Sequence, residues 1–174
     1  CRLQPVPGMD TRPTTDRVKE NIFNLIQEHV RGARVLDLFA GTGQLGIEAL
    51  SRGAQYCDFV ESGRAAYDIV YKNVKSARVS DRAGLHRKDA GQFLAEREKR
   101  SYDLIFLDPP YGGKLLENTL AMIERFDILS SNGIMICESA VEDRFAHNFS
   151  VQRERRYGAT MITVLQWQNS GTDE

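Results

Sequence analysis

The chain lacks any apolar run that approaches the roughly 18 residues a membrane-spanning helix requires. It also lacks the pattern of a secretory signal peptide. These absences argue against a membrane or secreted protein, and we predict a cytoplasmic one. Because the sequence begins at Cys1 rather than at a methionine, we expect an N-terminal element to precede it.

Cysteine is scarce, with three residues scattered over 174. Cys1, Cys57 and Cys137 form no CxxC pair and no cluster with histidine, which argues against a zinc site. We therefore predict no bound metal. Cys57 and Cys137 fall in strand-like segments, so we expect reduced thiols in or near the core rather than nucleophiles in a catalytic loop.

The chain has little net charge, −1 at neutral pH, so composition gives no general signal for nucleic-acid binding. Basic residues gather locally instead. Residues 1–34 hold six Lys or Arg against four acids, and two tight basic clusters lie at 97–100 and 153–156. If the basic residues of 1–34 and those of 153–156 lie close together in the folded protein, they can bind phosphates.

The sequence does contain an alternation of short apolar strands and amphipathic helices, which is typical of an α/β fold with a parallel sheet. Two final strand-like stretches meet at Gly158 and predict an antiparallel hairpin, giving seven strands. We expect one domain over 1–174, divided into an N-terminal segment and helix (1–33), a core (34–168) and a tail (169–174).

The helices are expected to alternate with the strands and to cover both faces of the sheet. The first has Thr14 or Thr15 as its cap and one apolar stripe. Helices are expected near 14–32, 44–52, 63–76, 90–99 and 114–128, with a short helical piece near 141–146. Strands are expected near 35–39, 56–60, 85–87, 102–107, 134–138, 150–157 and 160–167.

A glycine-rich turn follows the first strand. Gly41, Gly43 and Gly46 match the Gly-x-Gly-x-x-Gly pattern, which allows a sharp turn, close approach of a ligand and tight helix packing. Glu61 ends the second strand, where a carboxylate can accept from both hydroxyls of a ribose. The turn predicts an adenosine-type cofactor, and by itself it fits NAD as well as S-adenosylmethionine.

Two acidic residues favour S-adenosylmethionine over NAD as the cofactor. Asp37 precedes the turn, where it can meet a cationic amino-acid end directly or through water. Asp89 follows the third strand, where it can accept from an adenine amine, cap the next helix, or do both. We also place Phe39, Thr42 and Ala90 among the cofactor contacts.

The most informative residues are Asp108, Pro109, Pro110 and Tyr111, which follow the apolar strand at 102–107. Asp108 and the Pro109 carbonyl can accept hydrogen bonds from one planar amine. The prolines offer no competing N–H and stiffen the loop. The Tyr111 ring can stack on a base. This loop predicts a grip for an exocyclic NH2 group or a planar amide.

Together these motifs resemble the class I S-adenosylmethionine-dependent methyltransferases, and more narrowly the RsmD-type 16S ribosomal RNA guanine-N2 methyltransferases. The resemblance covers almost the whole chain. Beyond the two loops, its narrower markers are TRPTTDR at 11–17, GIEALSRGA at 46–54, FVE at 59–61 and RRYG at 155–158. In one departure, only Cys1-Arg2-Leu3 remains of the basic strand with which the family usually begins.

The resemblance implies a Rossmann-like fold, a methylated guanine N2 in small-subunit RNA, and catalysis by the 108–111 loop without a metal. It places segment 1–33 over the methionine end of the cofactor, with contacts from Thr14, Thr15 and Arg17. Asp108 is then a contact of both cofactor and amine. Candidate RNA contacts are Arg2, Arg12, Arg153, Arg155 and Arg156.

Other readings stay open at this point. The same amine grip suits adenine N6 in DNA or RNA, although 174 residues leave little room for a separate target-recognition region. A protein glutamine amide is disfavoured because such enzymes usually carry Asn where Asp108 stands. The glycine turn alone also fits a nicotinamide-dependent oxidoreductase. A non-catalytic RNA-binding protein with a dead cofactor site is the last alternative.

Overall fold

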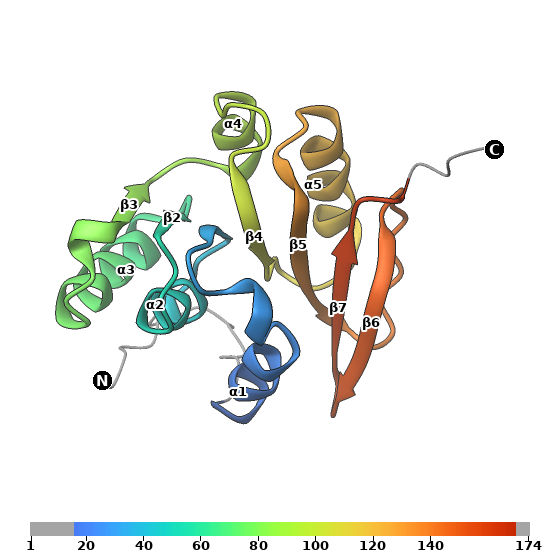
Figure 1. Cartoon of the computed structure of the whole chain (residues 1–174), viewed down its shortest axis with the longest axis horizontal. Helices are drawn as coiled ribbons and strands as arrows, with labels where there is room; N and C mark the ends of the chain where they lie inside the picture. The colour runs from blue at the N-terminus through green and yellow to red at the C-terminus, as the bar shows by residue number, and fades with distance from the viewer. Residues whose placement is uncertain (1–15, 170–174) are drawn as a thin grey trace.

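A single mixed sheet organises the chain. The computed structural model describes residues 16–169. These residues form a seven-stranded sheet in the order β3-β2-β1-β4-β5-β7-β6, with helices packed against it (Figure 1). The strands from β3 to β5 are parallel, and β7 and β6 continue the sheet in antiparallel pairing. The predicted α/β class, the strand number and the terminal hairpin are all confirmed.

Most elements fall within a few residues of their predicted places. The strands are β1 (Arg34–Leu38), β2 (Tyr56–Val60), β3 (Ala83–His86), β4 (Tyr102–Leu107), β5 (Leu129–Ala140), β6 (Ser150–Tyr157) and β7 (Thr160–Gln166). The α-helices are α1 (Asp16–Leu25), α2 (Gln44–Ser51), α3 (Arg64–Ser76), α4 (Ala90–Ala95) and α5 (Lys114–Arg125), with 3-10 turns η1 (Gln27–His29) and η2 (Ser80–Arg82). None of the described helices is long and apolar enough to span a membrane.

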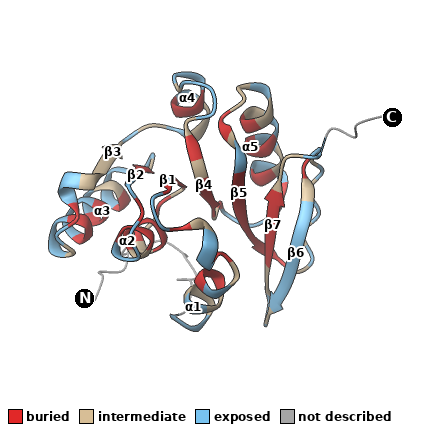
Figure 2. Cartoon of the chain, viewed as in Figure 1, coloured by how far each residue is buried: buried red, intermediate tan, exposed pale blue. Residues whose placement is uncertain are grey.

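The two faces of the sheet carry separate apolar clusters, because successive strand residues point to opposite sides. On one face, Phe23 of α1 and side chains of α2 and α3 pack on Val35, Phe106 and Ile136. On the other face, α4 and α5 pack on a second cluster of apolar side chains, which includes Leu107. We call these the α1–α3 face and the α4–α5 face. The inner strands are accordingly buried (Figure 2).

The parallel pairing of four strands ends at one level, although β5 itself continues to Ala140 against β7. Leu38 of β1 pairs with Val60 of β2 and with Leu107 of β4, and Leu107 pairs with Cys137 of β5. The residues one step further along the chain are Phe39, Glu61, Asp108 and Glu138. Functional groups from four separate segments are therefore brought to one edge of the sheet, where ligands of open α/β sheets bind.

The predicted helical piece near 141–146 is wrong. This stretch is a loop of turns and bends. The Asp143 carboxylate accepts from the backbone N–H of Ala140 at 3.1 Å, and Arg144 donates to the carbonyl of Val141. The backbone of Val141 is engaged on both sides, since its N–H donates to Ala159 O at 3.0 Å and its carbonyl, which a helix would pair with Phe145, accepts from Arg144.

Four other predicted boundaries need correction. The helix expected near 14–32 ends at Leu25, because Ile26 leaves the helical conformation, with a φ of −113°, and a 3-10 turn follows at Gln27–His29. The helix expected over 90–99 ends at Ala95, before a turn in which Arg100 has a positive φ of 59°. The helix expected to reach 128 ends at Arg125, because Asp127 has a φ of 56°, which no α-helix continues. β5 begins five residues earlier than the expected 134, since Leu129 already pairs with Tyr102 across a bulge.

Gly46 is predicted to let α2 pack closely on the sheet, and the structure confirms this. A Cβ at Gly46 would lie 2.7 Å from Cys57 Sγ and 2.8 Å from Phe59 Cζ, both in β2. Both distances are far inside van der Waals contact, and neither neighbour has room to withdraw because both are buried. The first turn of α2 therefore requires glycine.

We expect Gly46→Ala to lower the free energy of unfolding by about 1–3 kcal/mol through overpacking. The matched control is Gly63→Ala. Gly63 has a φ of −77°, and the nearest atom to its added methyl is 3.6 Å away. Urea denaturation of both variants checks the prediction, and equal stabilities would contradict it.

Candidate active site

The glycine turn after β1 is open on its ligand side. Gly41 has a φ of +59°, and a Cβ built there would meet no atom within 4 Å. The turn is held from behind, because Asn73 of α3 donates to the Thr42 carbonyl at 2.9 Å. The Ala40 N–H donates to Val60 O at 3.0 Å. The result is a fixed cradle with free space in front of it.

Phe39, the residue that opens this turn, adopts a left-handed backbone with a φ of 72°. Such a conformation costs a non-glycine residue about 1–3 kcal/mol and persists only where the surroundings enforce it. Here its side chain packs against the apolar cluster of the α4–α5 face. The cradle is thus held in a shape that the local sequence does not prefer.

Glu61 ties the glycine turn to the end of β2. Its Oε2 accepts from Gly41 N–H at 3.1 Å and its Oε1 from Gly63 N–H at 3.2 Å. Each carboxylate oxygen keeps further acceptor capacity. Glu61 is therefore available to hydroxyls while it fixes the entrance of the cradle.

Asp37 is buried beneath the turn, where its Oδ2 accepts from Gly46 N–H at 3.0 Å. Burial raises the pKa of Asp37 from 3.8 to about 7, the Gly46 hydrogen bond opposes the shift, and the charge of Glu61 adds to it. An ionised Asp37 is costly here unless a cation lies nearby.

Asp89 is exposed and caps α4, with Oδ1 accepting from Gln92 N–H at 3.2 Å. Helix capping is one of the two roles that the sequence predicts for Asp89, the other being contact with an adenine amine. Ala90 is the first residue of α4. The predicted adenine contact of Asp89 stays a prediction, since an exposed carboxylate can serve both partners.

The 108–111 loop leaves β4 toward the C-terminal hairpin. Pro109 is buried, whereas Tyr111 is exposed and its hydroxyl lies 3.4 Å from Thr160 Oγ1 at the start of β7. Gly112 N–H donates to Asp143 Oδ2 at 3.1 Å. The same Asp143 oxygen accepts from Ala140 at the end of β5, so the loop is anchored to that strand.

Asp108 and Glu138 form a pair of carboxyl groups. Asp108 is part-buried, and Glu138 is 5% exposed. Burial raises the pKa of Asp108 well above its ordinary value. The negative charge of Glu138, the hydrogen bond between the two carboxyls and the charge of Asp37 add to the rise. Two carboxyl groups hydrogen-bond only when one of them carries a proton.

The three acids Asp37, Asp108 and Glu138 lie on the α1–α3 face of three adjacent strands. Asp37 pairs with Phe106, two residues before Asp108, and Glu138 follows the Cys137 that pairs with Leu107. Sequence reasoning missed Glu138. Its signal was present, because it is an acid directly after the apolar run Ile134–Cys137, just as Asp108 follows its own strand.

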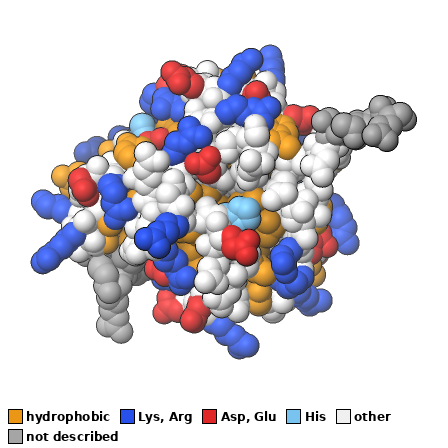
Figure 3. Space-filling view, viewed as in Figure 1, with side chains coloured by type: hydrophobic (Ala, Val, Ile, Leu, Met, Phe, Trp, Pro, Cys, Tyr) orange, Lys and Arg blue, Asp and Glu red, His pale blue; other side chains and the backbone are white. Residues whose placement is uncertain are grey.

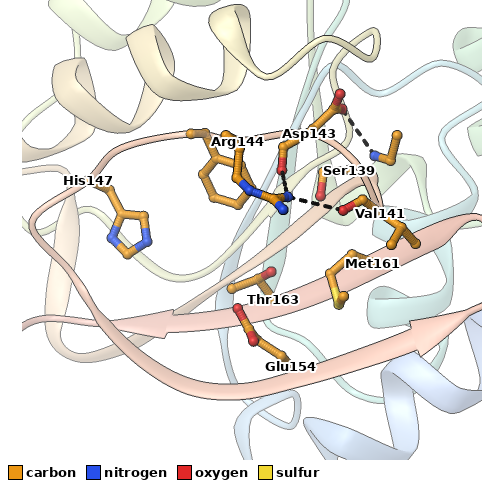
Figure 4. A pocket seen from close by; sticks show the side chains of 10 residues that line it. Ser139, Val141, Asp143, Arg144, His147, Glu154, Met161 and Thr163 are labelled. Atoms are coloured by element: carbon orange, nitrogen blue, oxygen red, sulfur yellow. Dashed lines mark hydrogen bonds between the residues drawn. The ribbon is translucent and has the colours of Figure 1, made fainter.

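A hollow of about 460 Å³ lies behind this loop, on the α4–α5 face of the hairpin (Figure 4). Ser139, Met161 and Thr163 line it from the strands, and Arg144 and His147 from the loop after β5. Glu138 and Ile162, which alternate with these strand residues, point to the opposite face. The hollow is thus separated from Asp108 by the sheet.

The predicted RNA contacts divide into two groups. Arg153, Arg155 and Arg156 lie on the exposed edge strand β6, whereas Arg2 and Arg12 fall outside the described residues, as do Thr14 and Thr15. Arg17 is exposed on α1. Lys and Arg side chains are interspersed with acids over the face in Figure 3 rather than forming one continuous basic surface.

The basic cluster at 97–100 is engaged within the chain. Arg97 lies over the Phe93 ring at 4.3 Å, and Arg100 pairs with Asp127 at 2.8 Å. Cys57 and Cys137 are free, buried thiols, as predicted. Within residues 16–169, His, Cys, Asp and Glu form no group of three suited to a metal ion.

The sheet, the glycine cradle and the acid-bearing strand ends define a Rossmann-like methyltransferase fold. The family model described as "Conserved hypothetical protein 95" matches residues 1–166. The chain belongs to this family, the RsmD-type methyltransferases, as its motifs indicated.

Relatives agree over nearly the full length. "Putative rRNA methyltransferase YlbH" of Bacillus subtilis is 40% identical over 94% of this chain and 92% of its own. "Ribosomal RNA small subunit methyltransferase D" of Escherichia coli is 34% identical over 99% and 88%. The solved structure of "Putative methyltransferase yhhF" from Escherichia coli has a TM-score of 0.81 at 36% identity, covering 94% of this chain and 92% of that one.

The raised pKa of Asp37 predicts a pH-dependent stability. Between its ordinary value of 3.8 and about 7, folded Asp37 holds a proton that the unfolded chain has lost. The free energy of unfolding therefore falls as pH rises through this window, by on the order of 3 kcal/mol.

We expect Asp37→Asn to make that fall clearly shallower, because the amide keeps an acceptor for Gly46 and does not ionise, while the raised pKa of Asp108 still contributes the remainder. Thermal unfolding from pH 4.5 to 8, with pH values chosen to span the window, checks this. Asp127→Asn, a surface change of the same kind, should keep the wild-type slope. An unchanged slope in Asp37→Asn would contradict the assignment.

Proposed function

We propose that this chain transfers a methyl group from S-adenosylmethionine to the exocyclic N2 amine of a guanine in small-subunit ribosomal RNA. The observation that carries the proposal is the meeting of two sites at one sheet edge. The glycine cradle after β1 and the 108–111 loop after β4 adjoin, since their strands pair directly. One site suits the methyl donor and the other suits an amine.

The residues present fit S-adenosylmethionine. Gly41 leaves open space before the turn, and Glu61 offers carboxylate oxygens at its rim for ribose hydroxyls. Asp37, a buried acid whose ionised form needs a nearby cation, suits the cationic amino-acid end. When bound, the group supplies a methyl carried on a positively charged sulfonium. We further assign Phe39, Thr42, Gly43, Asp89 and Ala90 to this site.

The N-terminal part of the chain is assigned a covering role. α1 packs on the same face of the sheet that carries Asp37 and Asp108, through Ile22 and Phe23. Segment 1–33 would then close over the methionine end of the cofactor, with contacts from Thr15 and Arg17. Residues 34–168 form the core of the same single domain.

Asp108 and the Pro109 carbonyl would accept the two N–H bonds of the target amine. The lone pair of guanine N2 is delocalised into the ring, so accepting both hydrogens favours a tetrahedral nitrogen whose lone pair points at the methyl. Alignment of this kind is worth effective molarities of roughly 10⁵–10⁸ M. The carboxylate also stabilises positive charge that develops on the nitrogen.

Tyr111 would stack on the base. Its ring is exposed, and its hydroxyl contact with Thr160 fixes it near β7. Base–aromatic stacking contributes about 1–3 kcal/mol. A guanine in structured RNA must leave its stack to reach this site, as target bases of such enzymes do.

The substrate class rests on the relatives. Two of them carry names that include ribosomal RNA methylation, and one names the small subunit. Guanine N2 as the acceptor rests on the narrower family resemblance together with the amine grip. We propose a small ribosomal subunit or an assembly intermediate as the partner, because the name of one relative specifies the small subunit.

We expect Asp108→Asn to retain binding of S-adenosylhomocysteine and to lose about 10²-fold or more of methyl transfer, because one strong acceptor for the amine is weakened. The measurement is tritium transfer to small subunits from a strain lacking the modification, with mass spectrometry of the nucleosides. N2-methylguanosine is the expected product. N6-methyladenosine, or methylation of duplex DNA alone, would refute the proposal.

Asp127→Asn is the matched control for that experiment. Asp127 lies in the turn after α5 and pairs with Arg100, away from the sheet edge. Its variant should transfer methyl groups at the wild-type rate. Near-wild-type transfer by Asp108→Asn would remove Asp108 from the mechanism.

Arg153 and Arg155 on β6 are proposed to contact phosphates. Each lost phosphate contact should reduce the slope of log K against log salt by about 0.7–0.9. We therefore expect Arg153→Ala/Arg155→Ala to bind RNA more weakly at low salt and with a shallower salt dependence. Lys75→Ala, on α3, is the control. A wild-type slope in the double variant would exclude β6 from the interface.

A further inference from the structure

Glu138 is a buried acid that the proposed reaction does not yet use. It lies in β5, one residue beyond the last pair of β5 with β4, and it is 5% exposed. A buried carboxyl at such a place costs stability unless it is paired or protonated. Its position beside the amine-gripping loop therefore calls for a role.

The register fixes Glu138 beside Asp108. Leu107 and Cys137 pair directly in the parallel β4–β5 ladder, so the next residue of each strand is Asp108 and Glu138. Both side chains lie on the α1–α3 face, since Phe106 and Ile136, two residues earlier, belong to that cluster. Burial raises the pKa of Asp108, and the charge of Glu138 and a hydrogen bond with it add to the rise, as expected for neighbouring carboxyls that hold one proton between them.

We propose that Glu138 is a positioning residue of the methyl-transfer site, which shares one proton with Asp108 and makes the pair the acceptor of the proton that the methylated amine releases. This inference rests on the proposed function. The hydrogen bond from one carboxyl to the other holds Asp108 in one orientation. Its remaining lone pairs are then directed to the amine.

The proposed step balances in protons, electron pairs and charge. The nitrogen lone pair forms the new N–C bond while the pair of the C–S bond goes to sulfur, which becomes neutral. The methylated nitrogen then carries one positive charge. One N–H proton passes to an Asp108 oxygen, and the N–H electron pair stays on nitrogen. The acid pair changes from one proton and one negative charge to two protons and no charge, and it returns a proton to water before the next turnover.

The groups around the pair come from every element packed there. β1 contributes Asp37, and β7 places the apolar Ile162 opposite Glu138. On α1, which covers this face, Lys19 lies 3.9 Å from Glu48 of α2. Tyr157 of β6 packs against the same apolar cluster, and α1 also carries Asp16, Arg17 and Glu20.

The test is Glu138→Gln, which keeps the shape and hydrogen-bonding reach of the side chain but cannot share a proton. The wild-type pair loses its two protons in two steps, and the second step, loss of the shared proton, is raised because it leaves two negative charges side by side. In Glu138→Gln the amide N–H donates to Asp108 in place of the shared proton, so this raised step is absent. In single-turnover methyl transfer, we expect the wild-type rate to fall on the basic side where the shared proton is lost, and we expect Glu138→Gln to lack this basic limb while its rate at neutral pH stays within about tenfold of the wild type.

A second readout does not need activity. In the free protein labelled with 13C-carboxyl aspartate, the Asp108 resonance, assigned by its loss in Asp108→Asn, should titrate in two steps in the wild type and in one step in Glu138→Gln, which lacks the step at higher pH. A titration that is the same in both proteins overturns the shared proton, even if transfer is active. If the wild type transfers no methyl group to RNA, the proposed function fails while the NMR result still decides the pair.

Two further variants separate this role from a structural one. Glu138→Asp keeps an acid and should keep the basic limb of the wild-type profile. Asp58→Asn removes another buried carboxylate, on the α4–α5 face, where Asp58 accepts from Tyr102 at 2.6 Å. It should lower stability without moving the limb. If the pH–rate profile changes equally in Asp58→Asn and Glu138→Gln, Glu138 acts only through the stability of the fold and the proposal is overturned.

Discussion

The parallel pairing of four strands stops at one level, and the arrangement of the whole site depends on this register. Backbone pairing of β2, β1, β4 and β5 sets the heights of Leu38, Val60, Leu107 and Cys137. Every group that follows is then placed by the ladder and not by a flexible loop. Sites built on regular elements in this way are held more tightly than sites built on loops.

The same constraint concentrates negative charge. Asp37, Asp108 and Glu138 lie along one face of adjacent strands, and burial raises the pKa of Asp37 and of Asp108. Self-repulsion of this kind lowers the stability of the empty chain, and it favours a cationic ligand and positive charge on an amine. Local instability at such a site is a common feature of binding and catalysis.

Much of this was predictable from the sequence, for reasons that differ by element. The glycine spacing and the apolar strands are local patterns, so the cradle, the 108–111 loop and the topology followed from them. The pairing of Asp108 with Glu138 depends on strand register, which no local pattern states. The helix expected at 141–146 failed for a similar reason, because Asp143 satisfies the backbone of Ala140 and of a loop some thirty residues away.

The anchoring of the 108–111 loop also bears on how this fold can change. Gly112 is held by Asp143, Gly113 lies against the backbone of Arg144, and Tyr111 meets Thr160. Two of these supports come from the loop that leads into the C-terminal hairpin, and the third, Thr160, belongs to the hairpin itself. The hairpin and the loop before it therefore cannot be exchanged independently of the active site. A lineage that replaced β6 and β7 to bind a new RNA would also lose contacts that hold the 108–111 loop, and it would have to replace them.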